Sequence, residues 1–166
     1  MRIGIIGPES TGKSTLGQQL ASFFHATYVP EYARTYVEAL DRPYTYEDVV
    51  AISQHQIEEI QTANQDMVFF DTELIITKIW FVYQYGACPQ WLEESIRDYP
   101  MDYYLICYPD LVWQADPCRE NGDIREELYL CYLNEVKKLN IPYSIIRGSD
   151  DTRLQCAIDA ILPRVR

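Results

Sequence analysis

The stretch GPESTGKST, residues 7–15, decides the fold expected for this chain. An isoleucine-rich apolar run precedes it, and the amphipathic stretch LGQQLASFF follows it. Its glycines, Gly7 and Gly12, let the backbone curl so that successive N–H groups point inward, and the amino end of the following helix adds partial positive charge. Together with Lys13 and Ser14 they fit the spacing G-x-x-x-x-G-K-S/T. The stretch therefore predicts a phosphate-binding loop between a buried strand and a helix.

Nucleotide contacts are expected along this whole loop. Lys13 would reach the β- and γ-phosphates of ATP, and the Ser14 hydroxyl would bind Mg²⁺. The alternative is a glycine-rich turn without a ligand, but the flanking strand and helix favour a binding loop. We expect ATP and Mg²⁺ as cofactors. The expected nucleotide-binding residues are Gly7, Glu9, Ser10, Thr11, Gly12, Lys13, Ser14 and Thr15.

The composition is typical of one globular domain, and we expect residues 1–166 to form it. Hydrophobic residues make up 48% and charged residues 23% of the chain. The 25 Asp and Glu residues against 14 Lys and Arg residues give a formal net charge of −11. A surface this acidic repels phosphate backbones, so nucleic acid is not an expected partner. ATP is also an anion, so its site must create a local positive field.

Neither a membrane nor an oxidising compartment is indicated. No apolar run approaches the ~20 residues that a membrane span needs, and residues 1–7 lack the pattern of a signal peptide. The cysteines are odd in number, and their spacing fits neither a zinc site nor a disulfide framework, so we expect free thiols. These features predict a cytoplasmic protein without a membrane partner. The five cysteines are Cys88, Cys107, Cys118, Cys131 and Cys156.

Strand-like and helix-like stretches alternate along the chain. The strand-like runs are continuously apolar, as expected for parallel strands that are buried on both faces. Alternation of this kind implies crossover units and a parallel sheet with helices on both sides. We therefore expect a three-layer α/β fold of the P-loop NTPase type with a five-stranded parallel sheet. The expected strands are 2–7, 26–29, 67–70, 103–108 and 143–147, and the expected helices are 13–24, 46–63, 72–86, 124–139 and 152–162.

Two carboxylates follow the third expected strand. Asp71 comes directly after the run MVFF, where a carboxylate can hold the Mg²⁺ that accompanies ATP. It also precedes a helical run, so a helix N-cap is the alternative role. Glu73 is a candidate second partner or base at the acceptor, or it simply favours the helix dipole.

Glu31 and Arg34 follow the second expected strand, after the run TYVP. Because ligands of open α/β sheets bind at the carboxyl ends of the strands, both residues are expected near the phosphate-binding loop. A carboxylate there can accept a hydroxyl proton as the hydroxyl attacks the γ-phosphate. Arg34 would orient the acceptor. The alternative is a surface Glu–Arg pair on a helix.

The segment 113–125 has the composition of a lid. It carries Arg119 and Arg125 beside an Asn-Gly turn signal, and arginines on a closing loop stabilise charge on a transferring phosphoryl group. Trp113 and Asp116 are candidate substrate contacts in the same segment. Solvated loop charges, and a packing role for the tryptophan, are the alternatives.

Four stretches resemble the ribosylnicotinamide kinase domain of NadR-type proteins, a group of P-loop kinase-like ATPases. The first is shared by all P-loop proteins, whereas the second and third are more specific to this group. The resemblance runs from about residue 7 to residue 161 and implies phosphorylation of a ribosyl 5′-hydroxyl by ATP with Mg²⁺, hence a role in NAD metabolism. The stretches are GPESTGKS, EYARTYV, DTELIITKIWFVYQYG and DYPMDYYLI, the last followed by W-x-x-D-x-x-R at Trp113, Asp116 and Arg119.

The chain departs from the family pattern in the acceptor half of the site. Pro30 stands where the pattern has a tryptophan, and Gln61 is assigned to the position of a second stacking aromatic residue. Ribosylnicotinamide is therefore expected to be a weak acceptor. The leading hypothesis is an ATP-dependent small-molecule kinase that acts on a nucleoside-like hydroxyl, with ribosylnicotinamide as one candidate partner. The alternatives are another nucleoside or metabolite kinase, and a nucleotide-binding regulatory ATPase.

Overall fold

Parallel strands form one five-stranded sheet in the computed structural model, which describes residues 1–115 and 122–165. Their order is β2-β3-β1-β4-β5, so the first strand of the chain lies at the centre. Every neighbouring pair is parallel, which confirms the expected sheet. The strands are β1 (Arg2–Ile6), β2 (Thr27–Val29), β3 (Val68–Asp71), β4 (Tyr103–Cys107) and β5 (Tyr143–Ile146).

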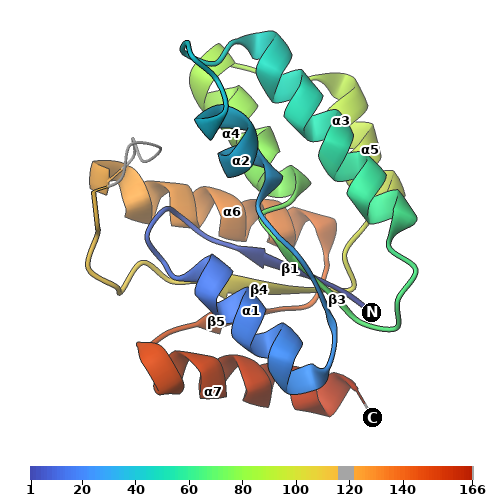
Figure 1. The fold of residues 1–166 in the computed structure, drawn as a ribbon, viewed down its shortest axis with the longest axis vertical. Helices are drawn as coiled ribbons and strands as arrows, with labels where there is room; N and C mark the ends of the chain where they lie inside the picture. Colours follow the sequence, from blue (N-terminus) through green and yellow to red (C-terminus); the bar gives the residue numbers. More distant parts are fainter. Residues whose placement is uncertain (116–121, 166) are drawn as a thin grey trace.

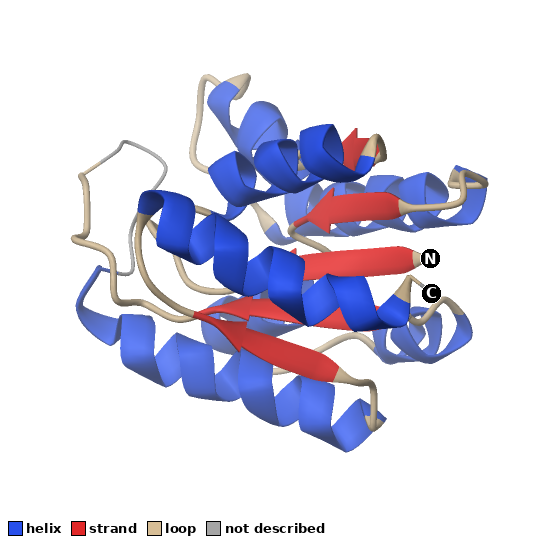
Figure 2. Cartoon of the chain, turned by 90° about the horizontal axis from the view of Figure 1, so that it is seen from below, coloured by secondary structure: helices blue, strands red, loops and turns tan. Residues whose placement is uncertain are grey.

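Helices cover both faces of this sheet, as the two views show (Figure 1, Figure 2). One face carries the first and last helices, which contact each other, and the other carries the helices from the middle of the chain. The expected three-layer arrangement is therefore confirmed. The helices are α1 (Lys13–Phe24), α2 (Tyr32–Glu38), α3 (Tyr46–Thr62), α4 (Leu74–Tyr85), α5 (Gln90–Asp98), α6 (Arg125–Leu139) and α7 (Asp150–Ile161), with short 3₁₀ turns at Gly122–Ile124 and Leu162–Arg164.

Alternate residues of the central strands pack into two separate cores. In β1, Ile3 and Ile5 face α1 and α7, whereas Ile6 faces the layer of α3 to α6. In β3, Phe69 packs on the side of α1 and α7, and Phe70 packs on the side of α3 to α6. Both faces are apolar because both are covered, and this explains the continuous apolar runs in the sequence.

Two helices were not expected from the sequence, α2 and α5. In α5 only Leu92 and Ile96 are buried, and α2 has seven residues with Ala33 as its buried residue. The seven residues of α2 are too few to show a helical period, whereas Leu92 and Ile96 of α5 lie four residues apart on one face, a helical signal that was present in the sequence. None of the helices in the described part of the chain has both the length and the hydropathy of a membrane-spanning segment.

Candidate active site

The phosphate-binding loop joins the carboxyl end of β1 to α1 in a tight backbone path. Gly7 has φ 148° and Gly12 has φ 72°, conformations that other residues rarely adopt. A Cβ at Gly7 would lie 2.6 Å from the carbonyl oxygen of Cys107 at the end of β4, so only glycine fits there. The buried Thr11 hydroxyl donates to the Pro8 carbonyl oxygen at 2.8 Å and holds the curl from inside.

Lys13 begins α1 and lies over the loop. Its Nζ donates to the carbonyl oxygens of Gly7 at 2.9 Å and Pro8 at 3.0 Å. Gly12, the N-cap residue, has no capping side chain, and the first turn of α1 contains no acidic residue. The N–H groups and the partial positive charge at this helix end therefore remain suited to an anion.

A cavity of about 320 Å³ extends from this loop across the edge of the sheet. One end is formed by the loop, and the other by side chains of α2, α4, α6 and the segment before α3. The lining residues are Gly7, Glu9, Ser10, Thr11, Gly12, Lys13, Ser14, Thr15, Glu31, Ala33, Arg34, Val37, Tyr44, Thr72, Ile76, Thr77, Ile79, Trp80, Tyr83, Gln84, Leu128 and Tyr132. All the expected nucleotide-binding residues thus line a single cavity.

Glu31 lines this cavity at the N-cap position of α2. Burial raises the pKa of its carboxyl above the ordinary value, the nearby Lys13 ammonium lowers it, and the Asp71 carboxylate raises it again. Arg34 lines the cavity one helical turn later, and its Nε donates to Glu38 Oε1 at 2.8 Å. The two expected acceptor residues are therefore brought to the same cavity as the loop.

Asp71 ends β3 directly beside β1, and its side chain is almost completely buried. Its Oδ2 accepts a hydrogen bond from the Tyr28 hydroxyl at 2.9 Å, and its Oδ1 has no hydrogen-bond partner among the described residues. A buried carboxylate oxygen without a hydrogen-bond partner is suited to accept hydrogen bonds from the water molecules around Mg²⁺. This ion usually binds one or two carboxylates together with phosphate oxygens. Ser14 lines the cavity, whereas Asp71 lies just behind its wall next to the lining residue Thr72, so these two residues of the chain would hold the metal ion, Asp71 through the water shell.

The N-cap of α4 is Glu73, so the capping alternative for Asp71 is wrong. The Glu73 carboxylate accepts from the Ile75 amide at 3.0 Å and is buried. Burial raises the pKa of this carboxyl to about 7, against hydrogen bonds from the Ile75 amide and the Tyr104 hydroxyl. Glu73 is absent from the cavity wall, so its expected contact with substrate has no support in the structure.

The described part of the expected lid differs from a loop with projecting arginines. Arg125 is the first residue of α6 and is buried, and its guanidinium donates to the carbonyl oxygens of Leu111 at 2.9 Å and Ser10 at 3.4 Å. It therefore connects the start of α6 to the phosphate-binding loop. Trp113 lies against Gly122, where a Cβ would be 2.9 Å from the indole ring, which favours the packing role. The expected residues Asp116 and Arg119 lie outside the described residues.

The assignment of Gln61 to a ring-stacking position is wrong. Gln61 is exposed in the last turn of α3, and it does not line the cavity. Aromatic side chains from other elements line the cavity instead, and they were not expected from the sequence. They are Tyr44 before α3, Trp80 and Tyr83 on α4, and Tyr132 on α6. The Tyr44 and Trp80 rings meet edge to face, with 4.9 Å between centroids.

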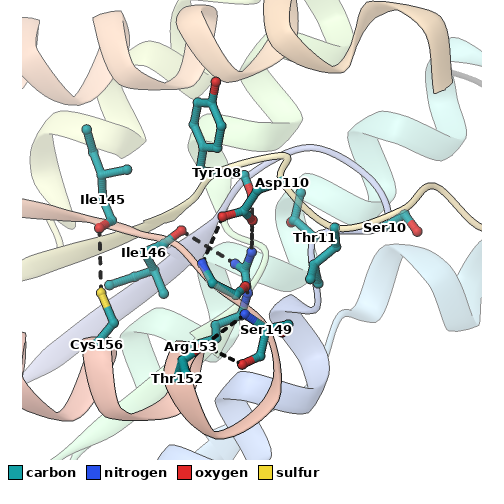
Figure 3. Close-up of polar contacts among 12 residues, drawn as sticks. Ser10, Thr11, Tyr108, Asp110, Ile145, Ile146, Ser149, Thr152, Arg153 and Cys156 are labelled. Atoms are coloured by element: carbon teal, nitrogen blue, oxygen red, sulfur yellow. Dashed lines mark hydrogen bonds and ion pairs between the residues drawn. The ribbon is translucent and has the colours of Figure 1, made fainter.

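Arg153 is a further residue beside the site that was not expected from the sequence (Figure 3). It is buried in α7, where Nε donates to the Gly148 carbonyl oxygen at 2.8 Å and one Nη donates to the Tyr108 carbonyl oxygen at 3.3 Å. It also forms an ion pair with Asp110. The loops after β4 and β5 are thereby tied together beside the phosphate-binding loop. Its place in the apolar stripe of α7, four residues before Ala157, was the signal available in the sequence.

The fold and cavity together define a P-loop nucleotide-binding domain. The sequence matches the AAA_28 family, described as an AAA domain, over residues 2–153, and the chain belongs to that family. It is 27% identical over 158 residues to the trifunctional NAD biosynthesis/regulator protein NadR of Salmonella typhimurium LT2 and 28% identical over 166 residues to that of Escherichia coli K12. These matches cover 89% and 93% of this chain but 38% and 40% of the relatives, so the chain spans about two fifths of their length.

Solved structures show the same fold. A NadR protein in complex with NR superposes with a TM-score of 0.76 at 24% identity, covering 96% of this chain and 49% of that one. Deoxyadenosine kinase from M. mycoides superposes with a TM-score of 0.66 at 15% identity, over the whole of both chains. The resemblance to the NadR group expected from the motifs is therefore confirmed.

Proposed function

We propose that residues 1–166 form one kinase-like unit that transfers the γ-phosphoryl group of ATP to a hydroxyl of a nucleoside-like acceptor. The observation that carries this proposal is the single cavity shared by the phosphate-binding loop, Glu31 and a set of aromatic side chains. A protein that only senses ATP needs the loop alone. Glu31 and the aromatic side chains are features of a site that also holds an acceptor.

The proposed roles follow from position and charge. The loop amides and Lys13 hold the phosphates, and bound Mg²⁺ would neutralise charge on the β- and γ-phosphate oxygens. Glu31 accepts the proton of the acceptor hydroxyl while the new O–P bond forms and the bond to the ADP oxygen breaks. Its raised pKa makes the carboxylate a stronger base than an ordinary exposed one.

The aromatic end of the cavity supports an acceptor with a planar ring. The side chains of Tyr44, Trp80, Tyr83 and Tyr132 line it, and Gln84 adds an amide that can hydrogen-bond. Rings of this kind stack on or meet a flat heterocycle edge to face. Because these aromatic side chains line the cavity and Gln61 does not, an acceptor ring has candidate stacking partners in this site. We propose ribosylnicotinamide as the first acceptor to test.

A substrate panel tests the proposed function. ADP formation is measured with ribosylnicotinamide, purine and pyrimidine ribonucleosides, deoxynucleosides and no acceptor, and the products are identified by mass spectrometry. Phosphorylation of at least one acceptor at its hydroxyl is expected. Acceptor-independent ADP release at the same rate in every reaction would instead support the regulatory ATPase alternative.

Two single substitutions, one of them a control, test the aromatic end of the cavity. Trp80→Ala is expected to raise the KM for the acceptor about 10-fold or more, the loss of one stacking contact, with little change in the KM for ATP. Val112→Ala, at a side chain that is 85% exposed and outside the cavity wall, is the control. Equal acceptor KM values in both variants would remove Trp80 from the acceptor site.

A further inference from the structure

Tyr28 lies at the junction of the residues that would hold the metal ion. It belongs to the edge strand β2, opposite Phe69 of β3. Its hydroxyl donates to Asp71 Oδ2 at 2.9 Å. The side chains of Ser14 and Gln18, in the first turns of α1, interact with the same hydroxyl. One phenol therefore connects β2, β3 and the start of α1.

The ring of Tyr28 is held in this place by Gly17. A Cβ at Gly17 would lie only 2.6 Å from Cε2 of Tyr28, so the ring packs on the bare backbone of α1. The ring thus occupies a narrow space between the sheet and the helix. Its hydroxyl reaches the carboxylate of Asp71, the last residue of β3.

The two oxygens of Asp71 have different surroundings. Oδ2 is occupied by the Tyr28 hydroxyl, whereas the buried Oδ1 has no hydrogen-bond partner among the described residues. A single donor on one oxygen fixes the rotation of the carboxylate and directs the other oxygen. Partners of this kind orient metal-binding carboxylates, and their loss weakens metal binding about 10–100-fold.

We propose that Tyr28 is a positioning residue that holds the Asp71 carboxylate in the orientation required for the divalent cation that accompanies the nucleotide. The inference rests on the proposed use of ATP with a metal ion, but not on the identity of the acceptor. Tyr28 does not line the cavity and its hydroxyl contacts Asp71, so it acts through this carboxylate and not on the substrate.

Binding of Mn²⁺ in place of Mg²⁺ gives a readout that does not depend on activity. Free Mn²⁺ is titrated by electron paramagnetic resonance against the full chain with saturating AMP-PNP. Tyr28→Phe keeps the ring on Gly17 and removes only the hydroxyl. We expect about 10-fold or greater loss of Mn²⁺ affinity, an unchanged affinity for AMP-PNP in EDTA, and circular dichroism like that of the wild type.

Tyr36→Phe is the matched control. The Tyr36 hydroxyl also donates to a carboxylate, Asp48 Oδ1 at 3.0 Å, but neither residue lines the cavity. This variant is expected to bind Mn²⁺ like the wild type. If Tyr28→Phe also binds it like the wild type, Tyr28 only packs the core and the proposal is overturned.

The proposal is equally overturned if Tyr28→Phe weakens AMP-PNP in EDTA as much as it weakens Mn²⁺, because the hydroxyl would then shape the loop and not the metal site. Failure of the proposed kinase function is a separate outcome. In that case the wild type would bind Mn²⁺ with AMP-PNP, and Tyr28→Phe would lose it, while no acceptor in the panel is phosphorylated.

Discussion

At the scale of single residues, Glu31 has the charge environment of a proton acceptor. Its pKa is raised by burial, lowered by the Lys13 ammonium, raised by the Asp71 carboxylate and lowered by the Arg34 guanidinium. Burial is the largest of these effects. The carboxylate is consequently more basic than an exposed glutamate, and it remains at the surface of the cavity where an acceptor would bind.

Substitution of Glu31 by Gln is expected to lower kcat by ~10²–10⁴-fold, the usual contribution of a general base. The affinity for AMP-PNP should remain, because Gln is of similar size and the phosphate-binding loop is untouched. Steady-state kinetic assays measure kcat, and calorimetric titration measures the affinity for AMP-PNP. Full activity of Glu31→Gln on every acceptor would exclude this residue as the base.

The pH dependence follows from the same environment. A base works only when deprotonated, and burial raises the pKa of Glu31 above the ordinary glutamate value of 4.5. Activity should therefore be complete at high pH and fall as the pH drops through a value above 4.5. The residual activity of Glu31→Gln should lack this acid limb. A wild-type profile that stays flat down to pH 4.5 would contradict the assignment.

At the scale of elements, the cap of α4 makes stability depend on pH. The Glu73 carboxyl has a pKa of about 7 in the folded chain against 4.5 for an ordinary glutamate. Between these values the folded state binds more protons than the unfolded state. The free energy of unfolding must therefore fall as the pH rises through this window.

Replacing Glu73 by Gln removes this dependence. We expect the wild type to lose up to about 3 kcal/mol relative to Glu73→Gln between pH 4.5 and 7, from the size of the pKa shift. Urea unfolding of both proteins at several pH values measures the difference. Parallel stability curves would show that burial does not raise the pKa of Glu73.

The Arg153 contacts tie α7 to two loops, and this can be tested by removing the guanidinium. Arg153→Met should lower the free energy of unfolding by about 2–4 kcal/mol, because Asp110 loses its ion pair and the buried or partly buried carbonyl oxygens of Ile146, Gly148 and Tyr108 lose this donor. The control is Arg147→Met. Arg147 is exposed, and its guanidinium lies 3.5 Å from the centre of the Tyr108 ring, so its loss should cost about 1 kcal/mol or less. Equal losses would contradict the bracing role.

At the scale of the whole molecule, a net charge of −11 surrounds a site with few cations. Lys13 and Arg34 are the basic residues among those that line the cavity. The local field for an anion therefore depends on loop amides, the α1 terminus and Lys13. Nucleotide binding should accordingly stabilise the entire fold through this one loop.

The thermal shift with nucleotide measures this coupling. At 100 times its dissociation constant, AMP-PNP with Mg²⁺ should stabilise the wild type by about 2.7 kcal/mol, which corresponds to roughly 5–10 °C in Tm for a chain of this size. Lys13→Ala should show little of this rise, because the lysine neutralises phosphate charge. Its Tm without nucleotide should remain close to that of the wild type. An equal rise in both proteins would contradict the role of Lys13.

The sequence by itself determined the phosphate-binding loop, the five strands and the parallel three-layer architecture. These features are set by local chemistry: glycines at positions of positive φ, continuous apolar runs, and helical spacing next to them. The close spacing of Glu31 and Arg34 after a strand was readable for the same reason, since the carboxyl end of a parallel strand leads to the binding edge.

Only the tertiary structure decided which distant side chains share the site. Trp80, Tyr44 and Tyr132 come from separate elements, and their meeting in one cavity depends on how α4 and α6 pack over the sheet. Gln61 was misplaced because a position on a long helix does not reveal which end approaches the loop. The hydrogen bond between Tyr28 and Asp71 and the ion pair between Arg153 and Asp110 could not be predicted from the sequence either. Each joins residues 43 positions apart, and such contacts depend on the strand order, which no local pattern encodes.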